Sequence, residues 1–159
     1  AREMKGVQWL CLLVLVITIS ACDRHKIYEE VYDFEAAVWN MDTIPEFEFS
    51  IDDNQPKRIL LNVRNSIDFK SQNLYLTYYL LNEQGTEIKS ELINIQLFDP
   101  ITGKPSGKGN SIFQHEVEIL PAYTFPKTGA YKIKVAQYMR EADLQEVPSV
   151  GIRVEEIKK

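Results

Sequence analysis

The sequence predicts an all-β protein, a single antiparallel β-sandwich of the immunoglobulin or jelly-roll type with seven to eight strands. Apolar and polar residues alternate with a period of two through most of the chain, and turns rich in Gly, Pro and Asn separate the alternating segments. No segment after residue 22 has the 3.6-residue apolar stripe of an amphipathic helix. A third observation, an apolar N-terminal run that stops at a cysteine, predicts a targeting segment ahead of the sandwich.

The apolar run extends from Val7 to Ala21 and follows two basic residues. It has the length of the apolar core of a secretory signal and falls short of the ~20 residues that cross a bilayer. It ends at Ile19-Ser20-Ala21-Cys22, an aliphatic residue, two small residues and a cysteine, which matches a bacterial lipobox. We therefore expect a lipoprotein signal peptide at residues 1–21 and lipidation of Cys22, through which the protein attaches to a membrane. The alternative is an uncleaved signal anchor with an incidental cysteine.

Cleavage before Cys22 leaves 138 residues, enough for one domain, and removes Cys11, so the mature chain has no disulfide. The mature part has 16 basic and 22 acidic residues, a net charge of -6. A mildly acidic domain without a basic cluster argues against nucleic acid as a partner.

The expected strands begin with "EFEFSI" at 46–51 and "RILLNVRN" at 58–65, in which Ile59, Leu61 and Val63 share one face. "NLYLTYYLL" at 73–81 carries apolar residues and Tyr on both faces, and the turn at 82–85 leads to a return strand at about 87–98. The apolar phase of that return strand changes, which predicts a β-bulge near Leu92. Leu76 is expected in the core.

Three further strands are expected in "HEVEIL" (115–120), "GAYKIKVAQY" (129–138) and "VGIRVEE" (150–156). Tyr131 is expected to pack at a corner of the sandwich, and Ile133 in its core. We assign residues 22–32 to the lipidated cysteine and a spacer, and residues 33–159 to the sandwich.

Catalytic and metal-binding patterns are not found in the sequence. His25 and His115 lack the spacing of zinc ligands, and no nucleophile-and-base motif is present. The carboxylates of Glu46 with Glu48, and of Glu116 with Glu118, fit the solvated faces of half-buried strands. We expect no enzyme activity, no cofactor, no metal site and no small-molecule ligand.

The segment "DPITGKPSGKG" at 99–109 has the most unusual composition, but it lacks the Lys-Ser/Thr ending and the following helix of a phosphate loop. It is either a long connection that needs glycine conformations or a partner-binding loop. Tyr75 and Tyr79 would form a sugar-stacking row if both were exposed, although burial in a sandwich explains them equally well.

Several segments in order resemble the gliding-motility-associated lipoproteins of the GldH type. They are the signal ending at Cys22, "VYDFEAAVWNMDTIPEFEF", "NVRNSIDFKSQNLYL", "LFDPITGKPSGKG" and "FPKTGAYKIKVAQYMREADLQEVPSVGIRVE". The residues that match the pattern are Arg64, Asn65, Asp68, Asn73, Asp99, Gly103, Gly107, Lys108, Gly109, Met139, Arg140, Gly151 and Arg153. Pro105-Ser106 stands where the pattern has an aromatic residue.

The resemblance implies a non-enzymatic envelope protein required for gliding motility, an accessory or assembly component of the gliding and type IX secretion machinery that works with other envelope proteins. We expect it at the outer membrane, facing the periplasm; Asp23 after Cys22 resembles the inner-membrane retention signal of enteric bacteria. The competing hypothesis is a surface lipoprotein with a carbohydrate-binding sandwich.

One further hypothesis concerns partner binding. Arg64 points away from its apolar neighbours at a strand end, and it either pins the following turn through Asn65 and Asp68 or forms a docking patch with Asp99, Gly103, Gly107, Lys108 and Gly109.

Overall fold

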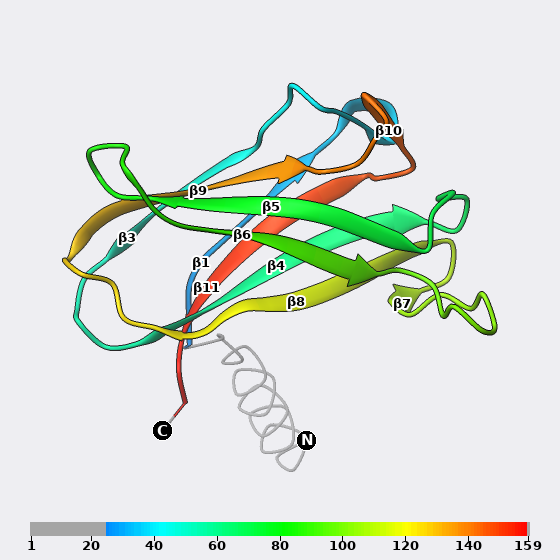
Figure 1. Cartoon of the computed structure of the whole chain (residues 1–159). Coiled ribbons are helices and arrows are strands. Elements are labelled where there is room, and N and C mark those ends of the chain that lie inside the picture. Colours follow the sequence, from blue (N-terminus) through cyan, green and yellow to red (C-terminus); the bar gives the residue numbers. More distant parts are fainter. Residues whose placement is uncertain (1–24, 159) are drawn as a thin grey trace, which may run out of the picture.

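The computed structural model describes residues 25–158, in which strands pair only in antiparallel fashion (Figure 1). A five-stranded sheet has the order β1 (Lys26–Asp33), β11 (Ser149–Glu156), β4 (Lys57–Ser66), β8 (Ile112–Tyr123), β7 (Lys108–Gly109). A four-stranded sheet has the order β3 (Glu46–Ile51), β9 (Gly129–Gln137), β5 (Asn73–Leu81), β6 (Glu87–Gln96). The 3-10 turn η1 (Glu35–Ala37) precedes a small ribbon of β2 (Val38–Asn40) and β10 (Asp143–Gln145).

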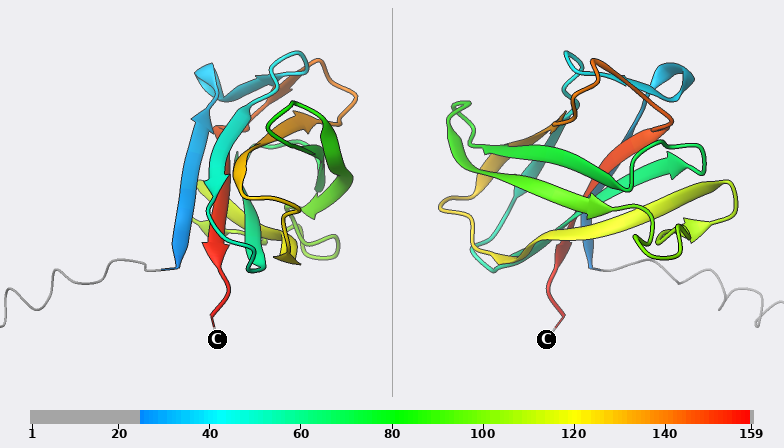
Figure 2. Two further views of the ribbon diagram at one scale, coloured as in Figure 1. Left: turned by 90° about the vertical axis from the view of Figure 1, so that its left-hand side faces the viewer. Right: turned by 45° about the vertical axis from the view of Figure 1, so that its right-hand side comes forward.

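The two large sheets face each other across one core, as the turned views of Figure 2 show. The all-β sandwich is confirmed. The period-two pattern explains the layering, because successive side chains of a strand point to opposite faces of its sheet. The apolar face predicted for β4 is fully buried, and so are Leu76 of β5 and the residues that share its face; the buried residues are Ile59, Leu61, Val63, Leu74, Leu76, Tyr78 and Leu80.

Aromatic side chains close one corner of the core, as expected around Tyr131. The Tyr131 hydroxyl donates to the carbonyl of Lys127 at 2.6 Å, and its ring lies 4.6 Å from that of Phe125. Phe49 packs edge-on against Phe125 with centroids 5.9 Å apart. The hydroxyl is therefore satisfied while the ring contributes apolar area to the core.

The predicted spacer needs correction, because residues 26–32 are part of the sandwich. They form most of β1, which pairs with β11 from Lys26 opposite Glu155 to Asp33 opposite Ser149. All side chains of β1 except the half-buried Tyr28 are exposed, so its sequence has no apolar alternation. This edge strand is held by its backbone ladder, which a side-chain pattern does not reveal.

The β-bulge of the β5–β6 hairpin also lies elsewhere than predicted. The register shifts between Leu80, opposite Lys89, and Leu81, opposite Glu87, so Ile88 is the extra residue. Leu92 stays in register and is 51% exposed. The phase change in the sequence therefore comes from an exposed leucine on the outer face as well as from a bulge.

Strand registers define two ends of the five-stranded sheet. Lys26, Glu155 and Arg58 lie in one row, and Asp33, Ser149 and Arg64 lie in another row at the opposite end. We call the second the distal end: it includes η1, the β2–β10 ribbon and the loops 67–72, 97–111 and 138–148 (Figure 1). The ten residues of β4 separate the two ends by about 30 Å.

Candidate functional site

The predicted lipidation site, Cys22, lies outside the described residues. The first strand begins at Lys26, four positions later, so a chain attached there enters the sandwich at the end opposite the distal end. Among residues 25–158 no helix is long and apolar enough to cross a bilayer.

Arg64 and Lys108, which sequence analysis grouped as a docking patch, lie on one row of the outer face. Gln114 of β8 is the cross-strand neighbour of Arg64 on one side and of Lys108 on the other. The Gln114 Oε1 atom lies 3.4 Å from both Nε and Nη2 of Arg64, at the long end of hydrogen-bonding distance. Two exposed cations therefore flank one amide at the distal end, a surface suited to an acidic group.

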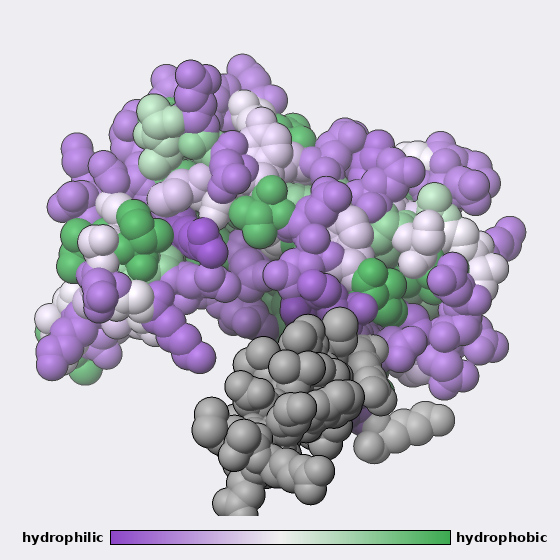
Figure 3. All heavy atoms as spheres, turned by 180° about the vertical axis from the view of Figure 1, so that it is seen from behind, coloured by the Kyte–Doolittle hydropathy of each residue, from purple (hydrophilic) through white to green (hydrophobic). Residues whose placement is uncertain are grey.

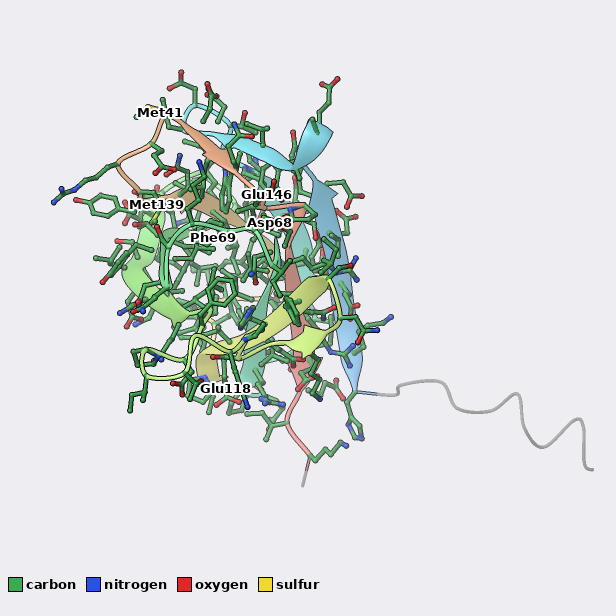
Figure 4. All side chains as sticks on the ribbon, turned by 90° about the vertical axis from the view of Figure 1, so that its right-hand side faces the viewer. Met41, Asp68, Phe69, Glu118, Met139 and Glu146 are labelled. Atoms are coloured by element: carbon green, nitrogen blue, oxygen red, sulfur yellow. The ribbon has the colours of Figure 1, made fainter. Side chains whose placement is uncertain are left out.

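The turn after β4 is pinned without Arg64. Asn65 is fully buried and donates from Nδ2 to the Ser66 carbonyl at 3.0 Å. The Ser66 hydroxyl donates to the Glu146 carboxylate and accepts the backbone N–H of Asp68 at 3.1 Å. Figure 4 shows Asp68 and Glu146 close together at this end. Sequence analysis missed Glu146, which has a φ of 69° and comes from a loop 80 residues away.

The glycine-rich segment is ordered by its own hydrogen bonds. The Asp99 carboxylate accepts the backbone N–H groups of Thr102 and Ile101, each at 2.8 Å, and these bonds hold its pKa below the usual value. The Gly103 N–H donates to the Asp99 carbonyl at 2.8 Å, and Gly103 has a φ of 69°. Asp99 and Gly103 thus have structural reasons to be present.

The two glycines around Lys108 are required by close packing. A Cβ on Gly109 would lie 1.9 Å from the Ile112 carbonyl oxygen, and one on Gly107 would lie 2.7 Å from Nε2 of His115. His115 belongs to β8 and points inward; burial lowers its pKa, and its Nε2 atom has no hydrogen-bond partner among residues 25–158. Of the predicted docking residues in this loop, Lys108 presents an exposed cation to solvent, and Asp99 has a half-exposed carboxylate that the loop's own amides bind.

An apolar groove at the distal end was missed by sequence analysis. It has a volume of about 630 Å³ and is lined by Ser71, Tyr75, Leu92, Tyr138, Met139, Arg140 and Glu141. Tyr138 is 66% exposed and Tyr75 38% exposed, whereas Tyr79 is half-buried. Two hydrogen bonds join the two sides of the groove: the Tyr138 N–H donates to the Tyr75 carbonyl at 2.8 Å, and the Tyr75 N–H donates to the Met139 sulfur at 3.4 Å. Tyr75 and Tyr79 therefore do not form a row of two exposed rings; the exposed ring that lines the groove with Tyr75 is Tyr138.

Arg153 takes part in a charged network on the outer face of the five-stranded sheet, away from the distal end. It donates to Glu29 of β1 at 2.6 Å and to Glu155 at 2.9 Å. Arg58 joins Glu155 to Glu118 of β8. Figure 3 shows this side of the molecule, where hydrophilic side chains predominate and hydrophobic ones form separate small patches.

One carboxylate of each predicted pair, Glu46 and Glu118, has a charged partner. Glu46 lies 3.0 Å from Lys132 and 3.2 Å from Lys134, and hydrogen bonds from these two lysines hold its pKa below the usual value. Glu118 is bound by Arg58. Within residues 25–158 no three His, Cys, Asp or Glu side chains gather as metal ligands would. We see no reacting group in this part of the chain that an adjacent base would activate.

Comparisons with known proteins agree with the resemblance. The family described as GldH lipoprotein matches residues 26–154. A protein of Christiangramia forsetii, the "Gliding motility lipoprotein GldH homolog", is 26% identical over 149 residues, which is 88% of this chain and 90% of that protein.

Solved structures give only distant likenesses. The VP2 subviral particle of infectious bursal disease virus matches with a TM-score of 0.34 and 14% identity, over 84% of this chain and 34% of that one. Latent PorU of Porphyromonas gingivalis matches with a TM-score of 0.38 and 7% identity, over 83% and 13%. At these TM-scores neither likeness bears on function.

Proposed function

Because the chain belongs to the GldH lipoprotein family, which is a family of gliding-motility lipoproteins, we propose that its distal end docks another envelope protein of the gliding machinery. In this proposal the protein is non-enzymatic, is lipid-anchored through Cys22 at the outer membrane facing the periplasm, and acts as an assembly component linked to type IX secretion. The fold would serve as a rigid spacer with a membrane end and a partner end.

One observation carries the proposal: residues that bear the family resemblance converge on the distal end from separate segments. Arg64 and Asp68 come from β4 and its loop, Lys108 from β7, and Met139 with Arg140 from the loop after β9. Figure 4 shows Asp68, Phe69, Met139 and Glu146 near one another, with Glu118 far from them. Loops on a rigid scaffold commonly carry recognition.

Two distances fit a spacer of this kind: the reach from Cys22 to the first strand and the length of β4. Only Asp23, Arg24 and His25 separate Cys22 from β1, and three residues span at most about 10 Å. A lipid on Cys22 would hold one end of the sandwich against the bilayer and leave the distal end about 30 Å farther along β4.

The distal end also has the composition of an interface. Arg64, Lys108 and Arg140 are exposed, and Arg140 makes no ion pair within residues 25–158. Tyr138 and Met139 lie beside Arg140, and Tyr, Met and Arg are enriched where proteins bind one another. An acidic, partly apolar partner surface fits this end.

The test is a set of charge removals in the native gliding cell, with Arg64→Ala, Lys108→Ala and Arg140→Ala combined. We expect gliding and partner copurification to fall at least tenfold while protein abundance and thermal melting stay unchanged, because all three side chains are solvent-exposed. The matched control removes three cations remote from the distal end, Lys26, Lys127 and Lys158, and should glide normally.

The outcome that contradicts the proposal is normal gliding of the distal triple variant at normal abundance. Loss of gliding that scales with lost protein would assign these residues a structural role. Arg64→Lys separates a need for positive charge from a need for the guanidinium group, since it keeps the charge but loses the planar fork.

A second candidate function is carbohydrate binding, favoured by the exposed rings of Tyr75 and Tyr138 in the apolar groove. Titration with a panel of neutral polysaccharides, followed by tyrosine fluorescence, tests it. Binding that Tyr138→Ala abolishes would support this function, and a flat titration for the whole panel would remove it.

A further inference from the structure

The sandwich has an open side, where one edge of each large sheet is unpaired. β6 is the last strand of the four-stranded sheet, and beyond the two-residue β7 the edge of β8 is also free. Within residues 25–158 no ladder joins β6 to β8, although the two strands run alongside each other (Figures 1 and 2). A groove of about 660 Å³ lies between them, lined by residues 94–96 of β6, residues 106–108, and residues 114–117 of β8.

The core is incompletely covered along this side. Ile88 and Ile93 of β6, and Val117 and Tyr123 of β8, pack on the core but remain half-exposed. His115, inward-facing on β8, lines the same groove, and its buried Nε2 atom has no hydrogen-bond partner in the described part of the chain. Four half-buried apolar side chains on two facing edges leave room for a further layer of apolar atoms.

β6 is the edge better suited to accept a strand. Its outer edge, on the side away from β5, is unpaired along all ten residues from Glu87 to Gln96. The edge of β8 is occupied at one end by β7 and interrupted at the other by Pro121, which has no N–H to donate. An extended peptide adds to a sheet by hydrogen-bonding to the free backbone N–H and C=O groups of such an edge.

The inward side chains of β6 specify what such a peptide would carry. Ile95 and Ile93 are apolar, Glu91 is acidic and Lys89 is basic, and residues two apart share one face. Burial and the neighbouring Glu91 raise the pKa of Tyr78, whose hydroxyl stays protonated and donates to Glu91 at 3.2 Å. Glu91 makes no ion pair within the described residues, so a cation facing it would be favourable.

We propose that the β6 edge binds an extended segment of a partner protein as an added antiparallel strand, with the pattern apolar-x-apolar-x-basic-x-acidic. The two apolar side chains cover Ile95 and Ile93, the basic one pairs with Glu91 and the acidic one with Lys89. This surface lies along the side of the sandwich and shares only Lys108 and Gln114, at one end of its groove, with the charged distal-end surface of the proposed function.

The test uses one defined probe, the capped peptide Ser-Val-Thr-Val-Thr-Lys-Thr-Glu-Ser, added to the full chain in detergent micelles. We expect NMR shift changes confined to residues 87–96 and 114–117, and slower amide exchange along β6. The same peptide with N-methyl groups at alternate positions on its pairing edge should bind at least tenfold more weakly, because it cannot complete the ladder.

A charge swap keeps the test independent of folding. Glu91→Lys should weaken the probe about fivefold and strengthen, by the same factor, a peptide in which Lys is replaced by Glu. Glu48→Lys, an exposed residue of β3 at the opposite edge of the same sheet, is the matched control and should leave the affinity unchanged. The double variant of Arg64→Ala and Arg140→Ala, two residues that do not line this groove, should bind the probe normally, which separates this inference from the proposed function.

Three results would overturn the inference. They are an absence of shift changes along β6 at about 2 mM peptide, equal binding of the N-methylated peptide, and shift changes confined to the groove of Tyr75 and Tyr138.

Discussion

Truncation of Ile133 to Ala should destabilise the sandwich strongly. Ile133 is fully buried on β9, opposite Phe47 on one side and Leu80 on the other. The substitution removes three carbon groups, whose transfer from water contributes about 2.4 kcal/mol. Both neighbouring strands are fixed in ladders, so the site collapses little and the cavity raises the loss to about 4 kcal/mol.

The assay is urea unfolding followed by tryptophan fluorescence, with Trp39 as the buried probe. With a slope of about 2 kcal/mol per M, a loss of about 4 kcal/mol lowers the urea midpoint by about 2 M at an unchanged slope. Ile101→Ala is the matched control, since Ile101 is 93% exposed at the tip of the glycine-rich segment. It should change the free energy of unfolding by less than about 0.5 kcal/mol.

The reasoning fails if Ile133→Ala shifts the midpoint by less than about 0.5 M, or if the two alanine variants behave alike. A large shift at Ile101 would mean that the glycine-rich tip packs against the protein. A small shift at Ile133 would mean that the two sheets do not share the core described above.

Three further predictions concern the N-terminus and the glycine-rich segment. Cys22→Ala should leave the signal peptide attached, seen as a heavier band on a gel, and globomycin should accumulate the same precursor; normal cleavage under both conditions would remove the lipobox assignment. The Asp99 pKa is lowered by backbone hydrogen bonds, so its stabilisation of the loop is present above the usual pKa of 3.8 and is lost as pH falls through the lower folded value. The Thr102 amide resonance, followed by NMR, should therefore move below pH 3.8, and a transition centred at or above that value contradicts the prediction. Gly103→Ala should lower the free energy of unfolding by about 1 kcal/mol through backbone strain alone, since its Cβ meets open space. Gly109→Ala should lower it clearly more, because its Cβ meets a carbonyl oxygen. Equal losses in urea unfolding would refute the packing at Gly109.

The sequence predicted best where side chains alternate between core and solvent. The inward face of β4, the core position of Leu76 and the corner at Tyr131 could be read from the sequence, because burial selects apolar residues at period two. β1 was missed because an edge strand with exposed side chains on both faces carries no such signal. The bulge was misplaced because Leu92, an exposed leucine, looks like a core residue in the pattern.

By itself the sequence determined the sandwich class and the family, and it predicts lipidation at Cys22, since each depends on residue types at short spacing along the chain. Only the tertiary structure decided which of those residues meet. It placed Gln114 between Arg64 and Lys108 and joined Ser66 to Glu146 across 80 residues. It also left β6 and β8 alongside each other in different sheets, with no ladder between them in the described part of the chain. These neighbours depend on strand order and register, which arise from cooperative packing of the whole core and have no local signature in the chain.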